Sequence, residues 1–242
     1  MIYVTGDTHG ERARWDEKYF PMVNTLDEKD YVIVCGDFGF LFRGTQNPEE
    51  AEFLNELEQK KFHILFVDGN HENFPLIFSY PQEEWNGGKV HRIRKNILHL
   101  MRGQVYSIDG KNFFTMGGAY SIDKAFREEG ISWWPEELPS EEEYDEAINN
   151  LEKCNNKVDY IITHAAPEDT MSVFHKDHLE ELKLNFFLEW VRENVEYRHW
   201  YFGHLHQDAD LWRNQTVLWF QIRNVETNVV VENKTGEVDE GY

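Results

Sequence analysis

The sequence predicts an α/β fold in which two mixed sheets pack together and helices cover their outer faces. Three observations indicate this fold. Short apolar runs that end in Gly, Asp or Asn alternate with longer helical patterns in the first part of the chain. Strand-rich stretches follow in the middle and at the C-terminal end. The length of 242 residues, with 40% hydrophobic residues, supports a sizeable core. We expect one domain over 1–236 and an acidic tail over 237–242.

The expected strands and helices of the α/β part follow from local patterns. Four short apolar runs, each followed by a polar turn, predict buried strands: 2–5, 31–35, 63–67 and 159–163. Pro48 opens a stretch of helix formers that predicts a helix to Lys61. Ser140 precedes three glutamates in a capping-box pattern, which predicts a helix to Asn156. A third helix is expected from about Lys176 to Asn194.

The strand-rich stretches contain shorter elements. Runs separated by Gly turns predict an antiparallel meander over 97–101, 104–108 and 112–117. The C-terminal part predicts consecutive strands near 199–203, 210–213, 216–222 and 228–232. The segment 119–139 fits neither periodicity, so it is either a long functional loop or a surface loop pinned by Trp133 and Trp134.

The charge of the chain excludes some classes of function. It carries 24 Lys+Arg against 45 Asp+Glu, a formal net charge of −21, which disfavours general affinity for nucleic acid or anionic membranes. One stretch, Trp85 to Ile108, has no acidic residue. It is either a basic strip for a polyanion or a set of charged sheet edges that block aggregation. Its cations are Lys89, Arg92, Arg94, Lys95 and Arg102.

The compartment is predicted from cysteine usage and from the N-terminus. Two cysteines, Cys35 and Cys154, offer no disulfide framework. The chain starts directly in an apolar strand without a basic leader region, and it contains no uninterrupted apolar stretch of membrane-spanning length. We therefore expect a cytoplasmic protein with no membrane association. The oligomeric state is not indicated.

Five turns that follow strand-like runs carry potential metal ligands. The turns are Gly6-Asp7-Thr8-His9-Gly10, Gly36-Asp37-Phe38-Gly39, Gly69-Asn70-His71-Glu72, Thr163-His164 and Gly203-His204-Leu205-His206. Functional groups gather at the carboxyl ends of strands in α/β sheets, so these turns can converge on one site. Carboxylate, amide and imidazole donors without thiolates suit Mn, Fe, Zn or related divalent ions. Seven candidate ligands exceed the needs of one ion and favour a two-metal site for phosphate ester chemistry. They are Asp7, His9, Asp37, Asn70, His164, His204 and His206.

The ordered set of five turns resembles the calcineurin-like metallophosphoesterases. The resemblance extends from residue 6 to residue 206 and implies a four-layer αββα sandwich of two mixed sheets with a dinuclear metal centre. By position, it implies two divalent ions (Mn, Fe, Zn or Ni) with this ligand set: Asp7, His9 and His206 for the first, Asn70, His164 and His204 for the second, and Asp37 as the bridge.

The resemblance also implies a mechanism for phosphoester hydrolysis. A metal-bridging hydroxide would attack phosphorus, and His71 would protonate the leaving oxygen or stabilise its charge. Glu72 is expected to orient His71 by a hydrogen bond, or else to be an ordinary acidic residue at a helix start. Arg43 and Arg127 are candidates for binding the substrate phosphate, and an ordinary surface position is the alternative for each.

The expected function is a metal-dependent hydrolase of a phosphomonoester, a phosphodiester or a nucleotide. A nuclease and a phosphoprotein phosphatase are the alternatives. The second turn lacks the Asp-Arg pair of the protein Ser/Thr phosphatases, because the chain continues as Phe40-Leu41-Phe42-Arg43-Gly44. A non-catalytic scaffold of the same fold is disfavoured, since the whole ligand set and His71 are present.

Overall fold

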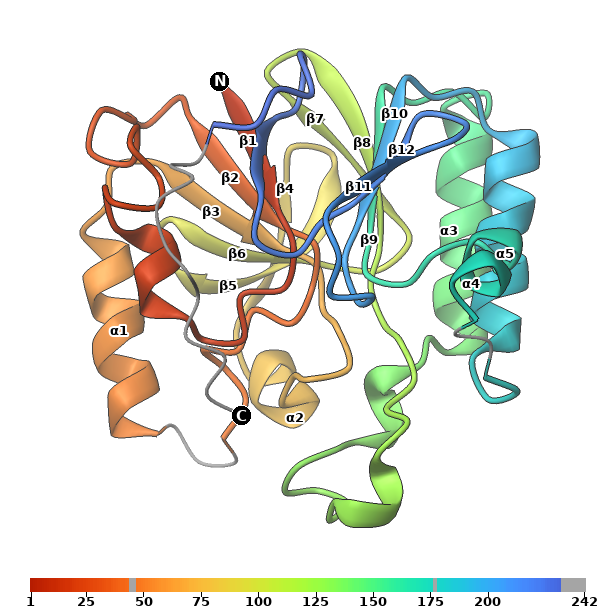
Figure 1. Cartoon of the computed structure of the whole chain (residues 1–242), viewed down its shortest axis with the longest axis horizontal. Coiled ribbons are helices and arrows are strands. Elements are labelled where there is room, and N and C mark those ends of the chain that lie inside the picture. The colour runs from red at the N-terminus through yellow and green to blue at the C-terminus, as the bar shows by residue number, and fades with distance from the viewer. Residues whose placement is uncertain (44–46, 176–177, 232–242) are drawn as a thin grey trace.

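The structure is a computed structural model that describes residues 1–43, 47–175 and 178–231. In these residues a seven-stranded sheet and a six-stranded sheet pack face to face, and helices cover the outer face of each (Figure 1). The two predicted mixed sheets are therefore confirmed. The predicted acidic tail, 237–242, lies outside the described residues.

The first sheet has a parallel centre and antiparallel edges. Its strand order is β13 (Ile222–Asn224), β1 (Ile2–Thr5), β2 (Tyr31–Val34), β3 (His63–Phe66), β6 (Ile97–Leu100), β5 (Gly88–Arg94) and β4 (Gln82–Trp85). Strands β1, β2, β3 and β6 run parallel, whereas the pairs β1–β13, β5–β6 and β4–β5 are antiparallel. The carboxyl ends of β1, β2 and β3 therefore lie at one edge of this sheet.

The second sheet has the same design. Its strand order is β11 (Ala209–Leu211), β12 (Gln215–Val217), β10 (His199–Phe202), β9 (Tyr160–Thr163), β8 (Lys111–Met116) and β7 (Gln104–Ile108). Strands β12, β10, β9 and β8 run parallel, and β11 and β7 pair antiparallel at the two edges. Strands β9 and β10 thus end side by side.

The helices begin where the sequence supplies caps. In α1 (Pro48–Glu58), the Asn47 side chain accepts from the Glu49 amide, and in α3 (Glu141–Lys153), Ser140 and Glu143 form the predicted capping box. The remaining helices are α2 (Phe74–Phe78), α4 (Glu168–Phe174), α5 (Leu182–Asn194) and the short 3₁₀ turns η1 (Arg12–Trp15), η2 (Lys124–Phe126) and η3 (Pro135–Glu137). Helix α1 covers the first sheet, and α3, α4 and α5 cover the second (Figure 1).

Three apolar layers separate these four layers of structure. Phe53 and Leu57 of α1 pack with Val32 and Phe66 of the first sheet. Side chains from the inner faces of both sheets, such as Leu98 and Tyr201, share the central layer. Residues of α3 and α5 pack against the outer face of the second sheet. The predicted four-layer αββα sandwich is confirmed.

Some of the expected elements lie elsewhere or differ. The meander holds for β7 and β8, but β6 belongs to the first sheet, between β3 and β5. All four residues of β6 are buried, as in a strand with neighbours on both sides. The run 216–222 is divided between β12 and β13, which lie in opposite sheets. In the described part of 228–232, the only pairing is the bridge between Val230 and Arg223.

Besides the short 3₁₀ turns, four elements were not expected, namely β4, β5, α2 and α4, and one expected helix is shorter. Strand β4 was not predicted because it reads Gln-Glu-Glu-Trp, which is too polar to indicate a strand. Its partner β5 was not predicted either. The short helices α2 and α4 were not predicted. The third expected helix begins at Leu182, and positions 176 and 177 of that expectation lie outside the described residues. No helix in the described part of the chain is long and apolar enough to cross a membrane.

Candidate metal centre

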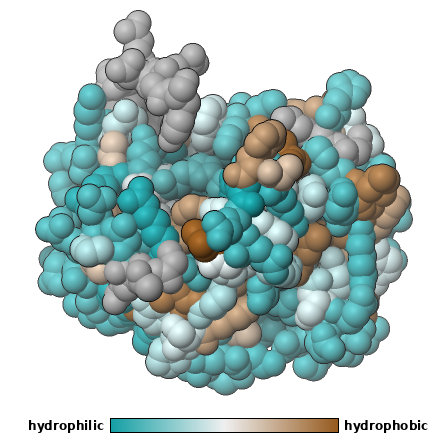
Figure 2. Space-filling view, turned by 90° about the horizontal axis from the view of Figure 1, so that it is seen from below, coloured by the Kyte–Doolittle hydropathy of each residue, from teal (hydrophilic) through white to brown (hydrophobic). Residues whose placement is uncertain are grey.

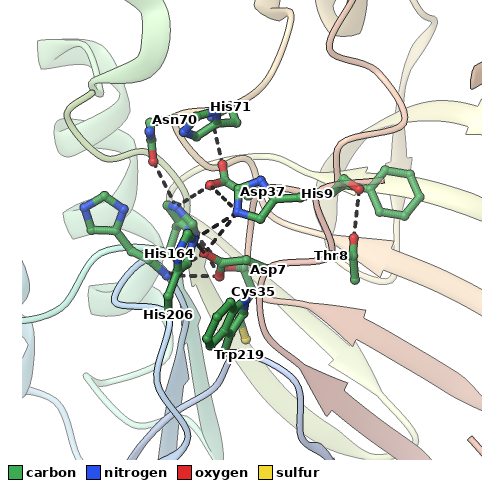
Figure 3. Close-up of polar contacts among 12 residues, drawn as sticks. Asp7, Thr8, His9, Cys35, Asp37, Asn70, His71, His164, His206 and Trp219 are labelled. Atoms are coloured by element: carbon green, nitrogen blue, oxygen red, sulfur yellow. Dashed lines mark hydrogen bonds and ion pairs between the residues drawn. The ribbon is translucent and has the colours of Figure 1, made fainter. Parts of the chain in front are cut away.

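The five predicted turns meet at the carboxyl ends of strands from both sheets (Figure 3). Asp7, Asp37 and Asn70 follow β1, β2 and β3 of the first sheet. His164 follows β9, and His204 follows β10, in the second sheet. Because parallel strands end at a common edge, residues far apart in sequence come together there.

Asp7, His9, Asp37 and His206 form a cluster that fits a metal ion. Each offers one ligand atom, and these four atoms all lie within 4.8 Å of one another. His206 Nε2 is 3.2 Å from Asp7 Oδ2, and His9 Nε2 is 3.7 Å from Asp37 Oδ2. Trp219 stacks on the His206 ring with a centroid distance of 5.1 Å (Figure 3). The structure thus brings together one complete set of oxygen and nitrogen donors.

A second set of donors also meets at Asp37. His164 Nε2 lies 3.2 Å from Asn70 Oδ1 and 3.5 Å from Asp37 Oδ2. His164 Nδ1 lies 2.7 Å from the carbonyl oxygen of Cys35 and donates to it, which orients the ring. The Asn70 amide donates to Ser121 Oγ at 3.1 Å, and this bond aims its oxygen at His164.

The cluster contains buried carboxylates, whose negative charge favours a bound cation. Burial disfavours a protonated His164, but the carboxylates of Asp37 and Asp7 raise its pKa to about 10. Burial also raises the pKa of Asp37, and the neighbouring His164 and His71 lower it well below its ordinary value. Two ionised carboxylates with almost no exposed surface therefore lie within one polar cluster. This donor set and its negative charge fit divalent cations.

His204, the third residue of the predicted second set, lies beside His164 and near the carboxylate of Glu181. Its backbone amide donates to Asp7, at 3.0 and 3.2 Å from the two carboxylate oxygens. Its ring lies 5.0 Å from the ring of His164, centroid to centroid, while its Nε2 is 3.6 Å from Oε2 of buried Glu181. Of the predicted second set, the structure thus brings Asn70 and His164 within 3.2 Å of each other and places His204 beside His164, with Glu181 as a further neighbour.

The glycines of the turns make room for ligands from neighbouring strands. A Cβ atom at Gly36, where φ is +94°, would lie 2.2 Å from His164 Nδ1. A Cβ atom at Gly69 would lie 2.0 Å from Asp37 Oδ1. Both distances are impossible for a real side chain, so close approach requires glycine at these positions.

Glu72 has a different partner from the one expected. Its Oε1 accepts a hydrogen bond from the Phe38 amide at 2.7 Å, and none of the hydrogen bonds among the described residues joins it to His71. Burial and the Asp37 charge raise the pKa of Glu72 well above its ordinary value. The His71 amide, in turn, donates to Asp37 Oδ1 at 2.8 Å. Glu72 thus supports the turn that carries Asp37, because its side chain points at that turn rather than at the imidazole.

Arg127 reaches His71 from the 119–139 loop. Its Nη1 lies 3.2 Å from His71 Nδ1, its Nη2 lies 3.1 Å from His71 Nε2, and Nη2 also pairs with Asp123 at 2.7 Å. Burial lowers the pKa of His71 to about 4, with Asp37 opposing and Arg127 reinforcing the shift. The imidazole is therefore neutral near pH 7, and a guanidinium lies directly beside it.

Arg43 lies further from the donor clusters. Its side chain is 64% exposed, and its guanidinium lies 3.9 Å from the carboxylate of Glu49. It lines a pocket beside His9 and makes no described contact with Asp7, Asp37 or His71. The two candidate arginines thus occupy different places.

A buried ion-pair network behind the turns was missed from the sequence. Arg102 donates from Nε and Nη2 to Asp68 Oδ2 at 2.8 and 2.6 Å, and His99 Nε2 lies 3.0 Å from Asp68 Oδ1. Arg102 Nη2 also donates to the carbonyl oxygens of Glu136 and Glu137. Asp68 directly precedes Gly69-Asn70, a position in a buried strand end that could have revealed it.

This network changes the interpretation of the basic stretch 85–108. Arg102 is buried and neutralised by Asp68. Lys89 pairs with Glu146, and Arg92 pairs with Glu83. These pairings neutralise much of the predicted basic strip and fit the alternative of charged sheet edges.

Other carboxylates missed from the sequence hold the 119–139 loop against the site. Buried Glu181 accepts from the Tyr120 amide at 2.7 Å, and buried Glu137 accepts from the Ser121 amide at 3.0 Å. The loop projects below the rest of the molecule in Figure 1, where it is drawn in yellow-green. Hydrogen bonds thus hold both ends of this loop, and Arg127 of the same loop contacts His71.

The sequence was also compared with known families, curated proteins and solved structures. The sequence matches the family profile described as Calcineurin-like phosphoesterase (Metallophos) over residues 1–208. No curated protein matches the chain. Among solved structures, the chain is similar to a Staphylococcus aureus protein described as a candidate 5′-nucleotidase in complex with alpha-ketoglutarate, with 13% identity and a TM-score of 0.46.

That alignment covers 96% of this chain and 52% of the other, so this chain spans about half the length of that protein. The family match extends over all but the C-terminal part of the 242 residues and includes the five ligand-bearing turns. The chain therefore belongs to the calcineurin-like phosphoesterase family.

Proposed function

We propose that this protein is a divalent-metal-dependent phosphoesterase that hydrolyses a phosphorylated small molecule or a nucleotide. The observation that carries the proposal is the cluster of Asp7, His9, Asp37 and His206, whose ligand atoms lie within 4.8 Å of one another. Asn70 and His164 extend it across Asp37 to a second set. Family membership supports the same chemistry.

The residues of the two sets would hold two ions. Asp7, His9 and His206 would bind the first, Asn70, His164 and His204 the second, and Asp37 would bridge them. Two divalent ions bound there supply Lewis-acid polarisation of the phosphoryl group and activation of water near neutral pH. Manganese, iron, zinc and nickel all accept this donor set.

His71 and Arg127 would act on the substrate itself. The His71 amide is held by Asp37, so its ring has a fixed place beside the donor cluster. The ring is 5.2 Å from the ring of His9, centroid to centroid, within reach of an ester oxygen bound there. A neutral imidazole N–H donates a hydrogen bond to the developing charge on the leaving oxygen. The Arg127 guanidinium, whose Nη atoms contact His71, Asp123 and the Ser132 carbonyl oxygen, would bring a positive charge beside a bound phosphate.

The proposal is tested by activity and metal content together. Protein loaded with Mn²⁺ is expected to hydrolyse a chromogenic aryl phosphate or the bis-aryl diester. Asp37→Asn and His71→Ala are each expected to lower turnover by more than about 100-fold, as losses of a metal bridge and a proton donor do. Asp109→Asn, in an exposed turn, is the matched control. Unchanged turnover in both site variants, or failure to bind added Mn²⁺, would contradict the proposal.

The alternative functions have less support. A nuclease needs a cationic surface that tracks the nucleic acid backbone, whereas Lys89, Arg92 and Arg102 pair with carboxylates. A phosphoprotein phosphatase has no specific observation in its favour, and the Asp-Arg pair of that branch is absent at Gly36–Gly44. The small phosphorylated substrate is therefore the proposal we retain.

A further inference from the structure

A pocket of about 200 Å³ opens directly beside the metal cluster. His9 forms part of its wall, and the other polar lining residues are Arg12, Arg43, Glu49 and Glu50. None of these four is needed to hold a metal ion in the proposed centre. Phe42 supplies an aromatic wall. The pocket is therefore lined by charged groups that the proposed metal centre does not use, and it adjoins that centre at His9.

The pocket lies where the leaving group of a phosphoester would go. The His9 ring is 5.2 Å from the His71 ring, and the Phe42 ring is 5.9 Å from it, both measured between centroids. Two walls of the pocket thus contact the imidazole proposed to meet the leaving oxygen. An ester whose phosphorus lies at the metal cluster and whose leaving oxygen lies at His71 has room for its alcohol part in this pocket.

The lining can recognise hydroxyl groups. Arg12 Nη2 donates to the Glu49 carbonyl oxygen at 3.1 Å, and its guanidinium lies 4.7 Å from the Phe53 ring centroid. The carboxylate of Glu50 accepts from the Arg43 amide at 3.2 and 3.4 Å. These contacts leave guanidinium donors and carboxylate lone pairs unused. A hydroxyl both donates and accepts, so it pairs with either kind of group.

The same lining disfavours other leaving groups. Two guanidinium groups and two carboxylates give this set of four side chains no net formal charge. A polyanionic leaving group would meet the carboxylates of Glu49 and Glu50 as well as the two arginines, and a purely apolar one would pair with none of the four charged groups. Phe42 offers a face on which a sugar ring or a base can pack.

We propose that this pocket binds the polyhydroxylated alcohol part of the substrate, which makes the protein a phosphatase of sugar-like phosphomonoesters. The proposal rests on the proposed function of the metal centre and adds the class of leaving group. Two sources share this chemistry: the ribose of a nucleoside monophosphate and a free sugar phosphate. Glu50 and Arg12 are the residues expected to contact the hydroxyl groups.

The test compares three monoesters with the Mn²⁺-loaded protein: ribose 5-phosphate, adenosine 5′-monophosphate and n-pentyl phosphate. At least one hydroxylated ester is expected to exceed pentyl phosphate in kcat/KM by about tenfold or more, because each hydroxyl pairs with a charged group. The better of the two identifies the source. Equal kcat/KM for all three esters would overturn the proposal.

A variant then separates recognition from general damage. Glu50→Gln keeps an acceptor for the Arg43 amide, and it is expected to reduce the preference for the hydroxylated ester over pentyl phosphate by about tenfold. Glu52→Gln removes the same charge at an exposed position of α1 and is expected to leave the preference and the basal activity unchanged. A Glu50→Gln protein with the wild-type preference would overturn the proposal.

The proposed function and the pocket can fail separately. If the metal-loaded protein hydrolyses no ester at all, including an aryl phosphate, the proposed function fails. Calorimetric binding of ribose 5-phosphate to the metal-loaded protein then decides about the pocket. Weaker binding by Glu50→Gln than by Glu52→Gln supports it, and equal binding by the two variants overturns it.

Discussion

The guanidinium of Arg127 is placed against both ring nitrogens of His71, at 3.2 and 3.1 Å. A cation at this distance disfavours protonation of the imidazole and, at the same time, brings phosphate-binding donors next to it. At the scale of single residues, His71 and Arg127 therefore act as a pair. Their separation of 56 positions in the sequence conceals the pairing.

Replacement of Arg127 tests this pair. In the metal-free protein, Arg127→Ala is expected to raise the pKa of His71 from about 4 towards its ordinary value, because it removes a positive charge that opposes protonation. With Mn²⁺, the same variant is expected to raise KM for an aryl phosphate about tenfold through the loss of a charge-assisted contact. NMR titration of the histidine ring and steady-state kinetics measure the two effects.

Arg198 provides the control. It lies on the surface, where it pairs with Asp159 at 3.0 Å, and its side chain is 69% exposed. Arg198→Ala is expected to leave the pKa of His71 and KM unchanged. An unaltered His71 pKa in Arg127→Ala would contradict the assigned contact.

At the scale of elements, the Asp68 network joins three segments that position the site. Asp68 follows β3 and precedes the turn with Asn70, and His99 lies on β6. Arg102 follows β6 and donates to the loop carbonyl oxygens of Glu136 and Glu137. Burial raises the pKa of Asp68, but Arg102 and His99 lower it well below its ordinary value. The network therefore ties a ligand-bearing turn to the loop that carries Arg127.

Asp68→Asn is expected to lower the free energy of unfolding by about 3 kcal/mol, because it removes the buried carboxylate partner of Arg102 and leaves only the partly exposed carboxylate of Glu143 to pair with it. The stabilisation by Asp68 is present above the ordinary pKa of an aspartate and is lost as pH falls below it, since the folded-state pKa is lowered. Urea unfolding at pH 7 and at pH 3 measures both effects. Asp145→Asn, on the exposed face of α3, is the control. Equal stability of the two variants at pH 7 would refute the role of the network.

At the scale of the whole molecule, the two sheets share a central apolar layer. Residues of both inner faces, including Ile33, Leu98, Ile162 and Tyr201, belong to one buried cluster. Separation of the sheets would expose this cluster to water. We therefore propose that residues 1–236 fold as one unit, as the sequence predicts.

This proposal is checked by equilibrium unfolding. A single transition is expected, with coincident curves from tryptophan fluorescence and far-ultraviolet circular dichroism, because neither sheet can expose its inner face independently. The metal-free protein should be used, since bound ions would add their own transition. Two separated transitions would contradict a single folding unit.

The charge of the whole molecule disfavours polyanions but not a small phosphorylated substrate. Hydrophilic residues dominate the face seen in Figure 2, the side on which α2 and the 119–139 loop lie in Figure 1, and hydrophobic residues form scattered patches there. The net charge of −21 repels polyanions on average. Two divalent ions would add about +4 at the strand ends and reverse the local sign for a small phosphorylated substrate.

Local sequence patterns were enough to predict two packed sheets with outer helices, and also the types and order of the proposed ligands. Strand alternation, helix caps and Gly-containing turns are local patterns, so Asp7, Asp37, Asn70 and His164 could be placed at strand ends before any contact was known. The carboxyl ends of parallel strands meet at one edge, and this rule carried the prediction from sequence to a common site.

Which side chains meet follows from the tertiary structure. Strand β6 lies in the first sheet, and Glu72 accepts from the Phe38 amide. Arg127 contacts His71. These outcomes depend on which faces are buried and on how a long loop returns to the core. Such contacts join residues that are distant in sequence, and no local periodicity encodes them.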